Sequence, residues 1–181
     1  MSDSPEPTLS SELVYRGRIV SLRVDEVRLP SGQTRRREIV EHGGAVAIVA
    51  VDDQARVLLV RQFRKPVEQF LLEIPAGTLE PGEDPEACAH RELLEETGYR
   101  AERVERLIGF YSAPGFCTEY LHIYLATGLR EVGASPEEDE SIELVREPVA
   151  RALELIESGQ IQDAKSQVGL LAYLARTVQQ P

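Results

Sequence analysis

The chain has 181 residues, 42% of them hydrophobic and 28% charged, so it can bury a core without disulfide or structural-metal staples. Its formal net charge of −11 disfavours nonspecific binding to nucleic acid or to anionic membranes. No apolar run approaches the roughly 20 residues that span a bilayer, and the N-terminus lacks the features of a signal peptide. We therefore expect a folded cytoplasmic protein with no membrane and no nucleic-acid partner.

The first quarter of the chain predicts a small β element. Residues 1–10 are polar and rich in Ser and Pro, which predicts a flexible tail. Residues 11–43 alternate β-branched and charged side chains around Pro30-Ser31-Gly32, a pattern typical of a β-hairpin or a short antiparallel sheet. Residues 44–181 are expected to form one larger domain.

Strand-like and helical patterns alternate in residues 44–181 and predict an α/β fold. Buried strands are expected at 44–51 and 56–64, and a further strand at 70–77 ends at Pro75 and Gly77. Further strands are predicted at 104–111, 121–126 and 142–145. Helices are predicted at 148–158 and 163–178.

The segment from Gly77 to Tyr99 is unusually acidic and contains a predicted helix. Asp84 is a suitable N-cap before Pro85 at the first helical position, and Gly98 ends the helix after Thr97. At about 100° per residue, three carboxylates share one face: Glu92, Glu95 and Glu96. Broadly opposite, the side chains expected to face the core are Leu93, Leu94 and Ala87.

These like charges destabilise a helix by a few tenths of a kcal/mol each, so a compensating cation is expected. Arg91 can offset Glu95 one turn away, which leaves Glu92 and Glu96 for a metal ion. Oxygen ligands without His or Cys favour Mg²⁺ or Mn²⁺ over Zn²⁺. Taken alone, the cluster is also compatible with a solvated acidic helix face.

The spacing of the whole segment resembles the Nudix box of Nudix hydrolases. The matching residues are Gly77, Glu83 and the run RELLEETG at 91–98, with Tyr99 where an aliphatic residue is more usual. The resemblance implies a Nudix α/β/α sandwich around a mixed β-sheet, preceded here by the small antiparallel element. It also implies hydrolysis of a nucleoside diphosphate linked to another group, with two or three Mg²⁺ or Mn²⁺ ions.

The resemblance also implies roles for individual residues. Metal ligation falls to Glu92, Glu96 and the carbonyl of Ala76, a catalytic or orienting role to Glu95 and Arg91, and a supporting role to Glu83. A second acidic run, Pro136 to Glu143, is either a solvated loop or, by the resemblance, a loop that closes over the metals. In the second case Glu138 is the expected base that takes a proton from the attacking water, Glu140 a possible metal ligand, and Glu137 and Asp139 remain alternatives.

Stretches outside the box resemble the ADP-ribose pyrophosphatase subfamily. They are VYRGRIVSL at 14–22, VRQFR at 60–64, LEIPAG at 72–77 and SAPGFCTE at 112–119, which contains Pro114 and Glu119. The resemblance implies hydrolysis of ADP-ribose to AMP and ribose 5-phosphate. Another nucleoside diphosphate sugar, such as GDP-mannose or ADP-glucose, is the nearest alternative, and a noncatalytic nucleotide sensor is a third.

Substrate binding is expected to involve both parts of the chain. Arg64 is the leading candidate for a phosphate contact, because a guanidinium forks onto phosphate oxygens. The family's homodimers exchange their N-terminal sheets, which implies that these residues line the partner's pocket: Arg18, Ile19, Arg36 and Glu38. Pro114 and Glu119 are also expected to bind substrate. Tyr111 and Phe116 could contact it, but a position in the core is the more common use of such aromatic residues.

Overall fold

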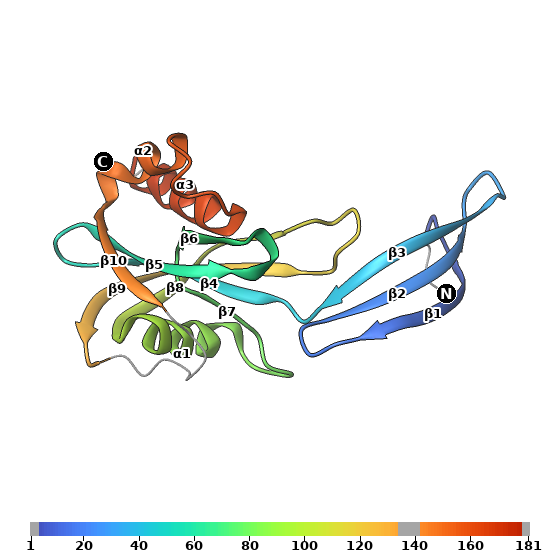
Figure 1. Cartoon of the computed structure of the whole chain (residues 1–181), viewed down its shortest axis with the longest axis horizontal. Coiled ribbons are helices and arrows are strands. Elements are labelled where there is room, and N and C mark those ends of the chain that lie inside the picture. Colours follow the sequence, from blue (N-terminus) through green and yellow to red (C-terminus); the bar gives the residue numbers. More distant parts are fainter. Residues whose placement is uncertain (1–3, 134–141, 179–181) are drawn as a thin grey trace. The chain divides into compact units, whose positions relative to one another are not determined.

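The structure is a computed structural model that describes residues 4–133 and 142–178 (Figure 1). Its contacts divide the chain into two compact units, Met1–Gly44 with Tyr111–Tyr120, and Ala45–Phe110 with Leu121–Pro181. The first boundary lies beside the one expected after residue 43. The grouping of 111–120 with the N-terminal sheet was not expected. Within the described residues, no helix is both long and apolar enough to cross a lipid bilayer.

Unit 1 contains a three-stranded antiparallel sheet in the order β1–β2–β3. The strands are β1 (Thr8–Arg16), β2 (Val20–Arg28) and β3 (Thr34–His42). Strand β1 begins inside the segment expected to be a flexible tail. The reason is that the Arg28 N–H donates to the carbonyl of Pro7 at 3.0 Å, and Glu6 forms an ion pair with Arg37 at 2.7 Å.

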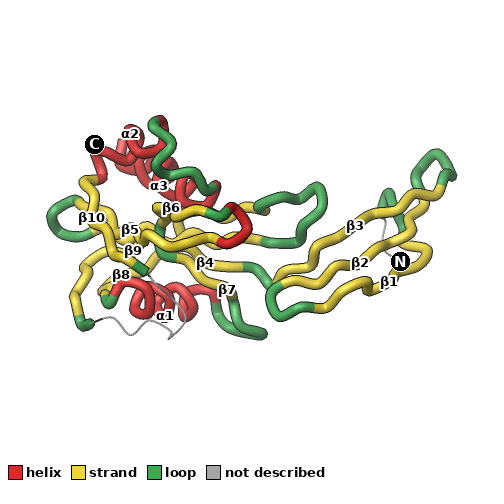
Figure 2. Tube along the Cα trace, in the orientation of Figure 1, coloured by secondary structure: helices red, strands yellow, loops and turns green. Residues whose placement is uncertain are grey.

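The described part of unit 2 is built around a seven-stranded mixed sheet (Figure 2). The sheet runs β10–β5–β4–β9–β8, with β6 paired to β5 and β7 paired to β4. Strand β4 is parallel to β9 and antiparallel to β5 and β7. In chain order the strands are β4 (Ala45–Val51), β5 (Arg56–Arg64), β6 (Gln69–Glu73), β7 (Ala76–Thr78), β8 (Tyr99–Tyr111), β9 (Tyr120–Glu131) and β10 (Glu143–Pro148).

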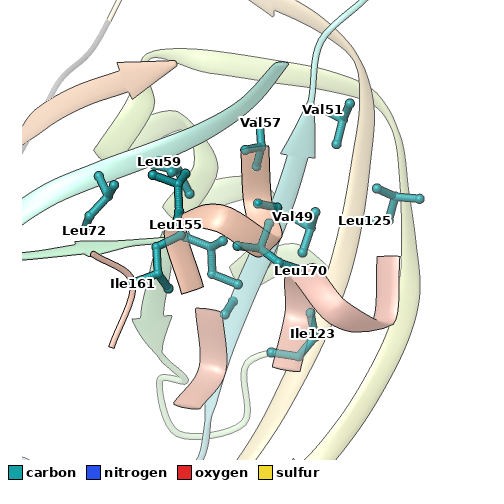
Figure 3. Packing of buried hydrophobic residues seen from close by; sticks show 13 residues of the cluster. Val49, Val51, Val57, Leu59, Leu72, Ile123, Leu125, Leu155, Ile161 and Leu170 are labelled. Carbon is teal, nitrogen blue, oxygen red and sulfur yellow. The ribbon is translucent and has the colours of Figure 1, made fainter. Parts of the chain in front are cut away.

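Helices cover both faces of this sheet, as the resemblance to the Nudix hydrolases implies (Figure 1). One face packs against α1 (Pro85–Thr97), through Leu93 and its buried neighbours. The other packs against α2 (Ala152–Glu157) and α3 (Ala164–Val178), through Leu155 and Leu170 (Figure 3). Each such buried leucine contributes about 1.5–3 kcal/mol. Two short 3₁₀ turns, η1 (Lys65–Val67) and η2 (Val149–Arg151), join strands to their neighbours.

Three local expectations differ from the structure. The strand expected at 70–77 is divided into β6 and β7, because the Pro75 carbonyl turns to accept the N–H of Ile48 at 2.8 Å. Ala87 is exposed, and the small buried residues of α1 are Cys88 and Ala89 instead. The helix expected at 148–158 is a 3₁₀ turn followed by the shorter α2.

Candidate active site

Helix α1 begins and ends where its local sequence signals place it. The Asp84 carboxylate accepts the N–H groups of Glu86 and Ala87 at 3.1 and 3.0 Å, and Pro85 follows at the first helical position. Gly98 has φ 74°, a left-handed conformation that favours glycine, and its N–H donates to the carbonyl of Leu94. The caps fix the rotation of the helix and therefore the direction of its acidic face.

Arg91 connects the acidic side chains around the helix. It donates two hydrogen bonds to Glu83, both at 3.0 Å. Its Nη1 also lies 2.7 Å from Glu92 and 3.1 Å from Glu95. The hydrogen bonds from Arg91, together with one from the N–H of Glu80, lower the pKa of Glu83 to about 2. Sequence reasoning paired Arg91 with Glu95 alone, because only that pair has the one-turn helical spacing.

The short strand β7 packs directly onto two of the predicted metal ligands. Glu96 is 7% exposed, and its carboxylate accepts the Ala76 N–H at 2.9 Å. A Cβ placed on Gly77 would lie 1.8 Å from Oε1 of Glu92. Gly77 is therefore required for close approach: its missing side chain leaves the space that the Glu92 carboxylate occupies.

The chemistry of these donors fits a hard divalent cation. The two carboxylates Glu92 and Glu96 lie against the backbone at Ala76 and Gly77, which offers oxygen ligands only. Within residues 4–133 and 142–178, however, no three His, Cys, Asp or Glu side chains are gathered as they would be around an ion. Arg91 engages Glu92 and the Ala76 N–H engages Glu96, so a cation has to displace these contacts to bind both carboxylates.

A buried charged network, which no sequence pattern indicates, lies at the end of β6, the strand that precedes β7. Glu73 is 1% exposed and accepts hydrogen bonds from Arg64, at 2.9 and 2.8 Å, and from Lys165. Burial alone would raise the pKa of Glu73, but these cationic hydrogen bonds outweigh it and lower the pKa. Ser166, next to Lys165, accepts the N–H of Ile74 at 2.9 Å. The start of α3 thus holds the end of β6 and the connection from β6 to β7.

Arg64, the predicted phosphate contact, is oriented by this network. Glu73 engages its Nε and Nη2. Hydrogen bonding to Glu73 raises the pKa of Arg64, and the charge of Glu96 contributes in the same direction. The guanidinium is therefore held within electrostatic reach of the acidic helix. The structure brings together, within unit 2, these predicted site residues: Arg64, Ala76, Arg91, Glu92, Glu95 and Glu96.

The other predicted substrate contacts lie in unit 1. Arg18 and the 57%-exposed Ile19 occupy the turn between β1 and β2, and Arg36 is exposed on β3. Glu38 and Pro114 line one pocket of about 380 Å³. Glu119 lies apart from that lining, 3.7 Å from His42.

The last predictions concern two aromatic residues and the acidic residues expected to include the catalytic base. Tyr111 and Phe116 are 57% and 58% exposed, so the expectation that they belong to the core is wrong. Tyr111 ends β8, and Phe116 lies in the following loop, whose backbone hydrogen-bonds to Val40 of β3 through Phe116 and Thr118. Glu138 and Glu140, with their alternatives Glu137 and Asp139, lie outside the described residues.

Comparison with known protein families gives two matches along the chain. Residues 41–166 match the NUDIX domain. Residues 6–40 match the N-terminal domain of nucleoside diphosphate sugar hydrolases. The boundary between the two matches falls at the end of β3, close to the division between the structural units.

Individual relatives cover nearly the whole chain. The chain is 46% identical to a methanol dehydrogenase activator of Bacillus methanolicus, over 91% of this chain and 90% of the relative. It is 44% identical to an ADP-ribose pyrophosphatase of Bacillus subtilis, over 92% of this chain and 91% of the relative. A solved structure described as an ADP compounds hydrolase matches with a TM-score of 0.87 and 26% identity, over 99% of this chain and 98% of that one.

Proposed function

Because the chain belongs to the Nudix family and is a hydrolase of pyrophosphate bonds, we propose that its substrate is ADP-ribose, which it cleaves to AMP and ribose 5-phosphate. The observation that carries this proposal is the 44% identity to an ADP-ribose pyrophosphatase over 92% of the chain. The subfamily-like stretches at 14–22, 60–64, 72–77 and 112–119 support it, because all of their residues except Gly77 lie outside the box that all Nudix hydrolases share.

Nudix hydrolases generally use divalent metals, and we assign Mg²⁺ to this chain, with Mn²⁺ as a substitute and two or three ions per site. Glu92, Glu96 and the carbonyl of Ala76 are the residues that would hold them. A divalent cation supplies charge neutralisation for the diphosphate and a water of lowered pKa. The oxygen-only donor set supports this choice of metal.

The chain's own residues then bind, orient and transfer a proton. Arg64, with its Nε and Nη2 held by Glu73, presents its remaining Nη1 to a phosphate oxygen. Arg91 and Glu95 orient the carboxylates of the helix. Glu138 takes the proton from the attacking water, and Glu140 is a further metal ligand. Glu138→Gln should lower kcat while leaving metal binding intact. The same result for Glu140→Gln alone would move the base to position 140.

A homodimer in the cytoplasm completes the proposal. The long exposed strand β1 supports it, because an edge strand with exposed Leu9, Leu13 and Tyr15 needs a cover. Arg18, Ile19, Arg36 and Glu38 would then serve the partner's site, together with Pro114 and Glu119. Mixing two inactive variants, Arg36→Ala and Glu96→Gln, should restore part of the activity if each site uses both chains. No recovery in a mixed dimer would contradict the exchange.

The substrate is tested by a panel assayed with purified protein and Mg²⁺. ADP-ribose should give the highest kcat/KM, above GDP-mannose, ADP-glucose, NADH and coenzyme A, with AMP and ribose 5-phosphate as products. A clear preference for another sugar nucleotide would refute the choice of substrate. The name of the Bacillus methanolicus relative favours a second candidate, action on a dehydrogenase. That candidate requires an effect on a methanol dehydrogenase, and ADP-ribose turnover without such an effect would exclude it.

A further inference from the structure

Lys165 is a mostly buried cation that connects two carboxylates near the proposed phosphate contact. It is the second residue of α3, and its side chain is 15% exposed. Its ammonium group donates to Oε2 of Glu73 and, at 2.9 Å, to Oδ2 of Asp163. Lysine is rarely taken out of water unless its charge is paired, and here it is paired twice. Lys165 therefore belongs to the buried network around Glu73 and not to the solvated surface of the helix.

This network ends at a guanidinium that solvent can reach. The carboxylate of Glu73 is buried, and it accepts Nε and Nη2 of Arg64 at 2.9 and 2.8 Å. The side chain of Arg64 is 38% exposed, and its Nη1 takes no part in this pair. An internal carboxylate thus orients a cation that an anionic ligand can approach from outside.

Lys165 also changes the balance of charge around Arg64. Three carboxylates act electrostatically on Arg64, those of Glu73, Glu96 and Asp163, and each raises its pKa. Lys165 is bonded to two of them. Among the described residues, its loss would leave Arg64 as the only cation bonded to Glu73. The buried carboxylate would then draw the guanidinium toward itself, because a buried charge requires compensation.

The backbone around Lys165 is fixed to the strand that carries Glu73. Ser166 is fully buried, and its hydroxyl accepts the N–H of Ile74 at 2.9 Å. The N–H of Ser166 donates to Asp163 at 3.1 Å, a contact that caps the first turn of α3. Both neighbours in this pair of contacts, Ser166 on the helix and Ile74 on the strand side, directly follow Lys165 and Glu73. The ammonium group is therefore held at Glu73 by the fold and not by a flexible surface contact.

We propose that Lys165 is a positioning residue for substrate binding, whose ammonium group holds the carboxylate of Glu73 so that Arg64 presents Nη1 to a phosphate oxygen of the nucleotide. Lys165 does not itself touch the substrate. The inference rests on the proposed function to the extent that a nucleoside diphosphate binds at Arg64. The physical reason is geometric, because a guanidinium that is fixed on two of its nitrogens offers the third in one direction only.

Lys165→Met tests the proposal, because methionine keeps most of the length of the side chain and removes its charge. The probe is ADP with Mg²⁺, measured by calorimetry, so the reading does not depend on turnover. The Kd for ADP should rise about 10-fold, as expected when one charged hydrogen bond loses its orientation. Arg64→Met should raise the Kd at least as much. The double variant should bind ADP no more weakly than Arg64→Met alone, because Lys165 acts through Arg64.

Three further variants separate charge from folding. Lys165→Arg restores a cation and should recover most of the affinity for ADP. Lys165→Gln keeps an N–H donor for Glu73 without the charge, so it replaces Lys165→Met if that variant does not fold, and it should also weaken ADP binding. Arg176→Met is the matched control, because it removes a positive charge from the last turn of the same helix, where Arg176 pairs with Glu105 at 2.8 Å. This control should leave the Kd unchanged.

A purely structural role for Lys165 predicts a lower melting temperature with unchanged ADP affinity, and that result would overturn the proposal. Additive losses of affinity in the double variant would also overturn it, since Lys165 would then act independently of Arg64. If Arg64→Met weakens ADP binding and Lys165→Met does not, the proposed phosphate contact stands and the role of Lys165 fails. If ADP-ribose is not hydrolysed but both variants bind ADP more weakly and without additivity, the proposed substrate fails and the role of Lys165 stands.

Discussion

Replacing Gly77 by alanine tests how strand β7 and helix α1 cooperate at the candidate metal site. The added Cβ would lie 1.8 Å from Oε1 of Glu92, whereas ordinary contact begins at 3.4 Å, so the carboxylate must retreat by about 1.6 Å. Gly77 is not among the glycines with positive φ, so the alanine adds no backbone strain. A misplacement of about 1 Å can cost about 100-fold in rate, and kcat/KM should fall by at least that factor.

The free energy of unfolding should fall by only about 1 kcal/mol, because the clash involves the end of a flexible side chain. Urea unfolding measures this change in the free energy of unfolding. A separate assay measures kcat/KM for ADP-ribose at saturating Mg²⁺. In a Glu92→Ala background the clash is absent, so Gly77→Ala should cost no further stability. Wild-type activity in Gly77→Ala, or an equal stability cost in both backgrounds, would refute the reasoning.

Three further predictions follow from the same contacts. Glu73→Leu removes the carboxylate that Arg64 and Lys165 share, but Lys165 keeps its ion pair with Asp163 and Arg64 is partly exposed, so the free energy of unfolding should fall by about 1–3 kcal/mol. An unchanged urea midpoint would contradict this. The pKa of Glu83 falls from 4.5 to about 2 on folding, so its stabilisation is present above pH 4.5 and lost as the pH falls toward 2. Glu83→Gln should therefore weaken the dependence of the free energy of unfolding on pH at acid pH. An unchanged dependence would exclude the contact between Glu83 and Arg91 as the source of that dependence. Chelation with EDTA should abolish hydrolysis and added Mg²⁺ should restore it, and turnover that survives chelation would exclude a metal role.

Features that depend on local sequence were predictable. Helix α1 spans Pro85–Thr97 as expected, because its N-cap, its first-turn proline and its C-terminal glycine all lie within the segment itself. The two strands around the turn at 52–54 were predicted for a similar reason, since apolar runs flank polar turn residues. The convergence of Glu92 and Glu96 on β7 at Ala76 and Gly77 was predictable only through the resemblance of the segment to a known box.

Features that depend on distant contacts were not predictable. Glu73 and Lys165 are separated by 92 positions, and neither residue type nor spacing indicates that they meet. The grouping of 111–120 with the N-terminal sheet depends on hydrogen bonds between Val40 and the loop at Phe116 and Thr118, which only the folded backbone reveals. Gln62 looks like an ordinary polar residue in a strand until its burial is known.

The most direct test of the central claim compares two glutamates of α1. Glu96 is buried and bonded to Ala76 of β7, whereas Glu86 is exposed in the first turn of the same helix. Glu96→Gln should lower kcat/KM for ADP-ribose by about 1,000-fold or more with Mg²⁺ present, because a metal ligand is lost, whereas Glu86→Gln should retain wild-type activity. Equal activity in the two variants would contradict the assignment of this helix as the metal-binding element of the active site.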